Sequence, residues 1–403
     1  MKGSGFLRGA LPFLCVVLAG LNLRASITSV GPVIGGIRED MGLSSGLAGL
    51  LTTLPLLAFA AFSSLAPRLA GRFGLSRTLF GGLVLLAAGI ALRSLPQEAA
   101  LFAGTAVLGA AIAAANVLLP GFVKRYFPRR VGPVTGTYIT AMNVGAALGA
   151  GLSAPLARSA GLGWQGALGV WAVPVLLAVL AWAPLLKERP ERSAPGRAPR
   201  GPWRSALAWQ VTLFMGLQSV VFFVSITWLP AILGEGGLSA VGAGWMVSLM
   251  QLVGIPATLL VPVLAARMRS QSALAAGAAL LSGTGILGLL FLGGPLSSVP
   301  VVLLGLGQGA AISLALTLFA LRAADAAGAA ALSGMAQTVG YLFAAAGPPL
   351  FGALHDATGG WTVPLVVLCL VTGAMLLAGI GAGRDAVVRV PERRPADVRR
   401  PRS

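Results

Sequence analysis

Long uncharged stretches of apolar residues dominate the chain, and short basic segments separate them. A helix needs about 20 apolar residues to cross the hydrocarbon region of a bilayer. Most of the uncharged stretches therefore fit one membrane span, and the longest fits two. The pattern predicts an all-α polytopic membrane protein. The uncharged stretches are 41–67, 99–123, 131–157, 159–186, 205–234, 236–266, 270–321 and 357–383.

Division of these stretches at charges and at Gly/Pro breaks predicts twelve transmembrane helices. The stretch 270–321 is divided between Gly293 and Pro300, because two glycines and two prolines interrupt a helix there. The predicted spans are 9–36, 44–66, 78–95, 100–123, 132–157, 163–186, 206–233, 240–266, 272–293, 298–321, 330–353 and 361–382.

The spans group into two halves of six, which we expect to form two pseudo-symmetric bundles. Residues 1–186 make the N-terminal bundle and 206–383 the C-terminal bundle. The Pro- and Arg-rich linker 187–205 cannot bury a core, and 384–403 form a basic tail. Short strings recur between the halves in the same order, as parallel repeats require. Examples are Gly109-Ala-Ala-Ile112 with Gly309-Ala-Ala-Ile312, and Ala141-Met-Asn-Val-Gly145 with Ala336-Gln-Thr-Val-Gly340.

The basic residues fix a predicted orientation. Apolar residues make up 56% of the chain, charged residues only 10%, and the net charge is +18. Of the 29 lysines and arginines, 25 fall on one side of the predicted spans; the rest are Arg24, Arg38, Arg93 and Arg158. Such a bias marks the cytoplasmic side. It predicts cytoplasmic termini, in the inner (plasma) membrane, and explains the positive charge without nucleic-acid binding.

Residues for metal, redox or ATP chemistry are scarce. The two cysteines, Cys15 and Cys369, both lie inside apolar runs, and His355 is the one histidine. Neither a metal-ligand spacing nor a phosphate-binding Gly-rich loop is present. We therefore expect no cofactor, no metal and no enzymatic activity, and a monomer whose partners are a small-molecule substrate and the lipid bilayer.

Arg24 is the principal candidate for chemistry inside the membrane. It lies near the middle of the first predicted span, and no Asp or Glu lies in any predicted span to pair with it. A central arginine costs roughly 2.5–3.5 kcal/mol on insertion scales, and such residues usually face a cavity or a partner. An anion, or the electron-rich end of a polar substrate, would suit its planar fork of donors. The alternative is an arginine that braces the bundle through helix carbonyls and amide side chains.

Polar and aromatic residues in other spans form the rest of the candidate substrate site. Amides in hydrocarbon need partners, so we expect them to face the bundle interior, where they either contact substrate or bond between helices. With Arg24, the candidates are Asn116, Tyr138, Asn143, Gln218, Phe222, Gln251, Gln337 and Tyr341.

Several strings resemble known transporters. Pro67-Arg-Leu-Ala-Gly-Arg-Phe-Gly-Leu-Ser-Arg77 is similar to the basic loop between helices 2 and 3 of the major facilitator superfamily, with Gly71 where an acidic residue is usual. Leu21-Asn-Leu-Arg-Ala-Ser-Ile-Thr-Ser-Val-Gly-Pro32 and Asn116-Val-Leu-Leu-Pro-Gly-Phe-Val-Lys-Arg125 resemble the cyanate and 2-nitroimidazole transporter family. The resemblance implies two bundles, with helices 1, 4, 7 and 10 lining the cavity. It suggests gating or conformational roles for Arg72, its counterpart Arg267, and the close-packing Gly145 and Gly149.

The sequence thus favours a secondary or facilitative transporter for a small anionic or polar solute, working by alternating access with Arg24 as its anchor. The alternative is a broad-specificity drug, nitroaromatic or neutral-solute transporter or exporter. Export of cations would be favoured by an acidic residue within a span, and none is predicted there.

Overall fold

The computed structural model describes residues 3–62, 65–127, 129–187, 202–292, 294–323 and 326–388. All named elements in these ranges are helical, which confirms the predicted fold class. The interior of the predicted linker (188–201) and most of the predicted tail (389–403) lie outside the described residues.

The elements follow one another along the chain in this order: α1 (Gly3–Thr28), η1 (Gly31–Val33), α2 (Ile34–Met41), α3 (Ser45–Phe62), α4 (Leu65–Phe73), α5 (Leu75–Arg93), α6 (Glu98–Tyr126), α7 (Val131–Ala154), η2 (Pro155–Ser159), α8 (Gly163–Gly169), α9 (Ala172–Trp182), η3 (Ala183–Lys187), η4 (Pro202–Arg204), α10 (Ala206–Glu235), α11 (Ala240–Arg267), α12 (Ser272–Phe291), η5 (Gly294–Ser297), α13 (Ser298–Leu321), α14 (Ala326–Thr358) and α15 (Thr362–Ala382).

Within the described ranges, 11 helical segments are long and apolar enough to cross a membrane. The 33-residue helix α14 stands where the eleventh predicted span, 330–353, falls. The division of 270–321 is confirmed, because α12 ends at Phe291 and α13 begins at Ser298.

The predicted spans 9–36 and 163–186 each correspond to one apolar helical segment, Ala10–Met41 and Gly163–Leu186, but each segment contains a break that was not predicted. The span 9–36 is interrupted after Thr28, where η1 carries Pro32, and proline supplies no backbone N–H to continue the helix. The helix resumes as α2 and reaches Met41. The span 163–186 is interrupted between α8 and α9 at Val170–Trp171. Pro174 has no N–H for the carbonyl of Val170, which instead accepts from the N–H of Val173.

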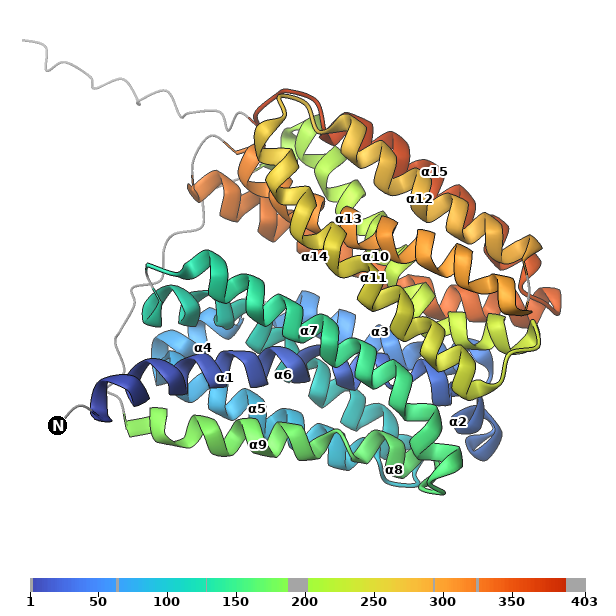
Figure 1. Cartoon of the computed structure of the whole chain (residues 1–403), viewed down its shortest axis with the longest axis horizontal. Helices are drawn as coiled ribbons and strands as arrows, with labels where there is room; N and C mark the ends of the chain where they lie inside the picture. Colours follow the sequence, from blue (N-terminus) through green and yellow to red (C-terminus); the bar gives the residue numbers. More distant parts are fainter. Residues whose placement is uncertain are drawn as a thin grey trace, which may run out of the picture.

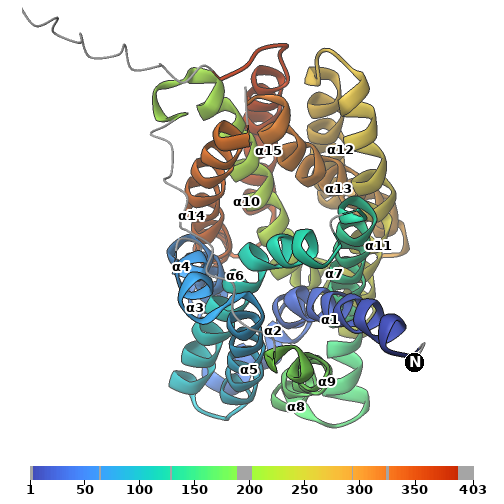
Figure 2. The same ribbon diagram turned by 90° about the vertical axis from the view of Figure 1, so that its left-hand side faces the viewer.

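The helices form two halves that converge at one end. Figure 1 shows α1–α9 together below and α10–α15 together above; the ribbons diverge on the left, where α1 begins, and approach each other on the right. We call the end where α1 begins and α15 ends the terminal end, and the other the opposite end. Figure 2 views the terminal end, with α1 and α7 of one half facing α10 and α11 of the other.

Helix α3 packs closely against α14 along the first of three contact lines between the halves. A Cβ atom at Gly49 would lie 2.7 Å from the backbone of Pro349, so the two helices touch through their main chains. Farther into the bundle, the Thr53 hydroxyl donates to the Ala345 carbonyl at 2.5 Å. The glycine permits this approach because it has no side chain to separate the helices.

Helices α7 and α11 form the second line, and η1 with α10 the third. The Ser248 hydroxyl donates to the Ala147 carbonyl at 2.6 Å. Gly31 of η1 lies against the carbonyl of Ile226, too close for any Cβ. All three contact lines hold the two halves together toward the opposite end.

Candidate functional site

Arg24 of α1 contacts helices of both halves. It stands near the centre of the apolar segment Ala10–Met41. Its Nη1 donates to Asn143 Oδ1 of α7 at 3.2 Å. Its Cζ lies 5.1 Å from the centroid of the Phe222 ring of α10. The structure therefore brings together two predicted residues of the first half and one of the second.

Tyr341 of α14 completes this group. Its phenol is near enough to Arg24 to interact electrostatically, and its ring meets Phe59 of α3 edge to face, with centroids 5.5 Å apart. Phe59 was not among the predicted site residues, because a phenylalanine in an apolar run carries no signal that separates it from lipid-facing neighbours. The cation that lies over an aromatic face here is the guanidinium of Arg24 itself, above the ring of Phe222.

The guanidinium of Arg24 keeps donors available. Its hydrogen bond to Asn143 is the one its guanidinium makes within the described residues, and the Arg24 residue as a whole is half-buried. Nor does a carboxylate of the described chain form an ion pair with it. Arg24 thus presents positive charge and unused N–H groups, as a binding site for an anionic or electron-rich group requires.

Gln251 lies on the face of α11 that packs against α7. Gly244, Ser248 and Gln251 follow at helical spacing, and the first two contact α7 directly. Asn143 precedes Ala147 by one turn, so helical spacing places Asn143 on the surface of α7 that faces α11. Gln251 is buried, and its Nε2 has no hydrogen-bond partner among the described residues. A buried donor without a partner is costly, which makes this amide a good candidate to contact solute.

The other predicted site residues take different positions. Gln218 is buried and donates within its own helix, to the Met215 carbonyl at 3.1 Å and to the Ser219 hydroxyl at 2.8 Å. Gln337 likewise donates to Ser333, one turn earlier, at 2.7 Å. Asn116 of α6 is exposed, and Tyr138 of α7 is buried.

The predicted gating residues fall into two groups. Arg72 and Arg267 are exposed near the terminal end; Arg72 lies over the ring of its neighbour Phe73, with Cζ 5.3 Å from the centroid. Gly145 and Gly149 pack against α1 within the first half, and a Cβ at Gly149 would lie 2.6 Å from the Ala25 carbonyl. Their roles in gating remain predictions.

Arg93 is a buried charge whose position the sequence did not reveal. It ends α5 and is only 1% exposed. Its Nη1 donates to the Ser26 carbonyl at 2.6 Å and its Nη2 to the Ser29 hydroxyl at 3.4 Å. The last carbonyls of a helix lack intrahelical donors, and a cation there complements the helix dipole. Arg93 therefore holds the end of α1, just beyond Arg24.

We expect Arg93→Met to lower the melting temperature of the purified, solute-free protein. The change leaves the Ser26 carbonyl buried without its donor, which costs about 1–3 kcal/mol. Arg93→Lys, which keeps one charged donor, should lie between Arg93→Met and the wild type. Thermal unfolding of the three proteins under one condition checks this, and equal melting temperatures for Arg93→Met and wild type would contradict it.

A cavity of about 1220 Å³ opens at the opposite end, apart from Arg24. Its lining includes Arg38, Asp40 and Arg158. Asp40 accepts from Trp164 Nε1 at 2.8 Å and from Gln165 Nε2 at 3.3 Å. Gly31 also lines this cavity, so the contact of η1 with α10 forms part of its floor.

The fold and the central polar site define a polytopic helical membrane protein with a charged group between two six-helix halves. The Major Facilitator Superfamily model matches residues 13–348, and the chain belongs to this superfamily. It is therefore a membrane transporter of small solutes and not an enzyme.

Similar proteins support the same conclusion. The chain is 47% identical over 378 residues to the 2-nitroimidazole transporter of Escherichia coli (strain K12), covering 93% of this chain and 95% of that protein. It is 30% identical over 385 residues to the cyanate transport protein CynX of the same organism, covering 94% of this chain and 98% of that protein. The fold matches the crystal structure of a D-xylose-proton symporter with a TM-score of 0.74 at 15% identity, covering 94% of this chain and 98% of that one.

Proposed function

We propose that this protein is a secondary or facilitative transporter that moves a small anionic or polar solute across the inner membrane by alternating access. Arg24 holds the solute between the two halves. The observation that carries this proposal is a guanidinium in the middle of a membrane span. It donates a hydrogen bond to Asn143, lies over the ring of Phe222, and has no carboxylate ion-pair partner among the described residues.

The contacts between the halves support alternating access. The close contacts of α3 with α14 and of α7 with α11 hold the two halves together toward the opposite end. Toward the terminal end, Asn116 and Thr338 are exposed, and polar side chains at membrane depth usually face a water-filled cavity. With both termini in the cytoplasm, as the bias of basic residues indicates, this is an inward-facing state. In the proposed cycle, residues 1–186 and 206–383 rock against each other as units.

The substrate class separates this proposal from broad drug or neutral-solute transport. We expect proteoliposomes that contain the purified protein to take up labelled cyanate, nitrite or small carboxylates in preference to neutral sugars and lipophilic cations. The positive charge of Arg24 repels a cation in a low-dielectric site and attracts an anion. Protein-free liposomes give the background. Preferential uptake of lipophilic cations, with the small anions ignored, would contradict the proposal.

A further inference from the structure

Charged residues of both halves meet at the opposite end around Asp356, in the last turns of α14. Its Oδ2 accepts the backbone N–H of Ser45, the first residue of α3, at 2.9 Å. Its Oδ1 lies 3.9 Å from Nη2 of Arg38, in the last turn of α2. A carboxylate at a helix N-terminus is stabilised by the free N–H groups and the helix dipole. Asp356 thus joins α14 to both α2 and α3 of the other half.

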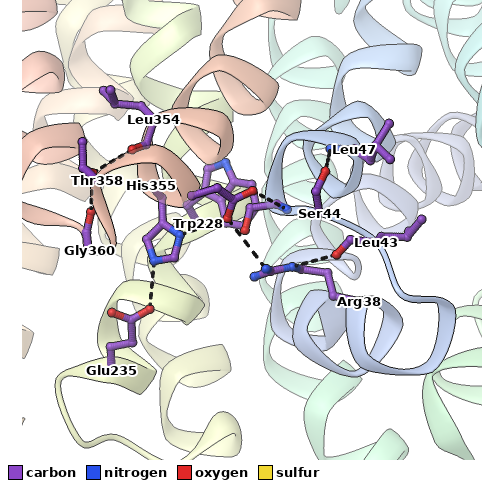
Figure 3. Close-up of polar contacts among 12 residues, drawn as sticks. Arg38, Leu43, Ser44, Leu47, Trp228, Glu235, Leu354, His355, Thr358 and Gly360 are labelled. Atoms are coloured by element: carbon purple, nitrogen blue, oxygen red, sulfur yellow. Dashed lines mark hydrogen bonds and ion pairs between the residues drawn. The ribbon is translucent and has the colours of Figure 1, made fainter.

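His355 links this carboxylate to a second one. Its Nδ1 lies 3.4 Å from Asp356 Oδ1, and its Nε2 lies 3.2 Å from Glu235 Oε1 at the end of α10. Figure 3 shows Glu235 on one side of His355 and Arg38, farther away, on the other side. The ring also packs against Trp361 at a tilt, with centroids 4.1 Å apart. His355, Asp356 and Glu235 all belong to the second half.

The charge of this cluster depends on the histidine. Asp356 alone faces Arg38 and the N-terminus of α3, and Glu235 contacts His355. With a neutral imidazole the net charge of Glu235, His355 and Asp356 is −2, and with an imidazolium it is −1. An imidazolium also competes with Arg38 for Asp356. Two other acids of this end, Glu39 and Asp40, lie on α2, and Asp40 is engaged by Trp164 and Gln165 within the first half.

We propose that His355, Asp356 and Glu235 form a pH-sensitive latch with Arg38 and the N-terminus of α3. Ionised Asp356 holds the opposite end closed, and protonation of His355 weakens the hold. The latch acts on the alternating access proposed above, so acid at the opposite face favours opening of that end.

Asp356 itself stays ionised over the range in which histidine titrates. Partial burial raises the pKa of this carboxyl, but hydrogen bonds from Ser45 and His355 and the charge of Arg38 outweigh it, and the net pKa lies below its ordinary value of 3.8. A carboxyl group whose pKa is lowered on folding stabilises the folded protein at pH values above its ordinary pKa. That stabilisation is lost only as the pH falls through the lowered pKa of the folded protein. Histidine is the side chain that ordinarily changes charge between about pH 5 and 8. In the proposed latch, protonation changes the charge of His355 while Asp356 keeps its own.

Distances between spin labels on the two halves test the latch without any solute. Cysteines replace Leu162 and Val363, exposed residues of the first and second half at the opposite end, in a background with Cys15→Ala and Cys369→Ala. Distance distributions are recorded in nanodiscs at about pH 7.5 and about pH 5.5, on either side of histidine titration. We expect the ratio of open to closed populations to rise about two- to fivefold at the lower pH, the range expected for an exposed ion pair.

Three variants separate the role of His355 from that of Asp356. His355→Gln removes the titrating group and should abolish the pH response. Asp356→Asn should raise the open population at both pH values. The matched control is Asp40→Asn, a carboxylate of the same end whose hydrogen bonds stay within one half; it should keep the wild-type pH response.

The latch is overturned if the wild-type distances do not change with pH, if His355→Gln responds like the wild type, or if Asp356→Asn stays closed. Since no solute is present, each of these results leaves the proposed substrate class untouched. Conversely, a preference for cations in the uptake assay leaves the latch standing.

Discussion

Arg24→Gln is expected to lower solute uptake by at least about 100-fold, because two charge-assisted hydrogen bonds of about 1.5–3 kcal/mol each are lost from the bound solute. The protein should still fold. Arg24 carries a positive charge without an ion-pair partner in the described chain, and its removal relieves a desolvation cost. Arg24→Lys keeps the charge but loses the planar fork of donors, so it should impair uptake strongly as well.

Melting temperatures and solute-induced shifts of the wild type, Arg24→Gln and Arg24→Lys decide between binding and bracing. A solute that binds the native state raises its stability by mass action, so the Gln protein should keep its melting temperature and lose the shift. Arg93→Met supplies the contrast, since there we expect stability to fall. If Arg24→Gln melts several degrees lower and still shows the wild-type shift, Arg24 is a structural brace and the site assignment is wrong.

Most of the membrane topology could be predicted because hydrocarbon imposes a simple rule: about 20 apolar residues make a span. Local breaks were less predictable. Pro32 and Pro174 both interrupt helices, whereas Pro55 and Pro230 lie within continuous ones. Whether a proline ends a helix depends on the neighbours that satisfy the freed carbonyl, and a single sequence does not contain that information.

The same limit applies to predicting the candidate site from the sequence. Arg24 could be identified because a charge in mid-membrane demands an explanation, and Asn143, Phe222 and Tyr341 do gather around it. Gln218 looked equally suitable, but it bonds to its own helix. Arg93 looked like an ordinary residue at the end of a span. Its burial depends on the close packing of α5 on α6, where a Cβ at Gly104 would overlap the Arg93 backbone.

Glycines inside one half and glycines between the halves should respond differently to a larger side chain. A Cβ at Gly145 would overlap the Leu21 carbonyl of α1, in the same half. No rocking of the halves relieves that overlap, so Gly145→Ala should destabilise the fold by about 1–3 kcal/mol, as overpacking does. A melting temperature equal to that of the wild type would show that α1 and α7 separate freely, as a hinge would.

Gly49→Val should instead trap the transporter with its opposite end open. The added Cβ would lie 2.7 Å from the backbone of Pro349, which belongs to the other half and cannot move aside as a side chain can. Separation of the halves removes the clash while each half keeps its own packing. We therefore expect uptake to fall at least about tenfold, since a bias of roughly 1.4 kcal/mol against the closed state changes its population tenfold. The melting temperature should stay near that of the wild type.

Two measurements and a matched control test the trap. The distance between labels at positions 162 and 363 should lengthen in Gly49→Val, and uptake should fall in the same preparation. Gly81→Val places the same side chain on a helix where a Cβ meets nothing within 4 Å, so it should leave distance and uptake unchanged. Wild-type uptake by Gly49→Val would contradict alternating access through the α3–α14 contact. Loss of stability without a longer distance would show that this contact holds the fold together and does not open during transport.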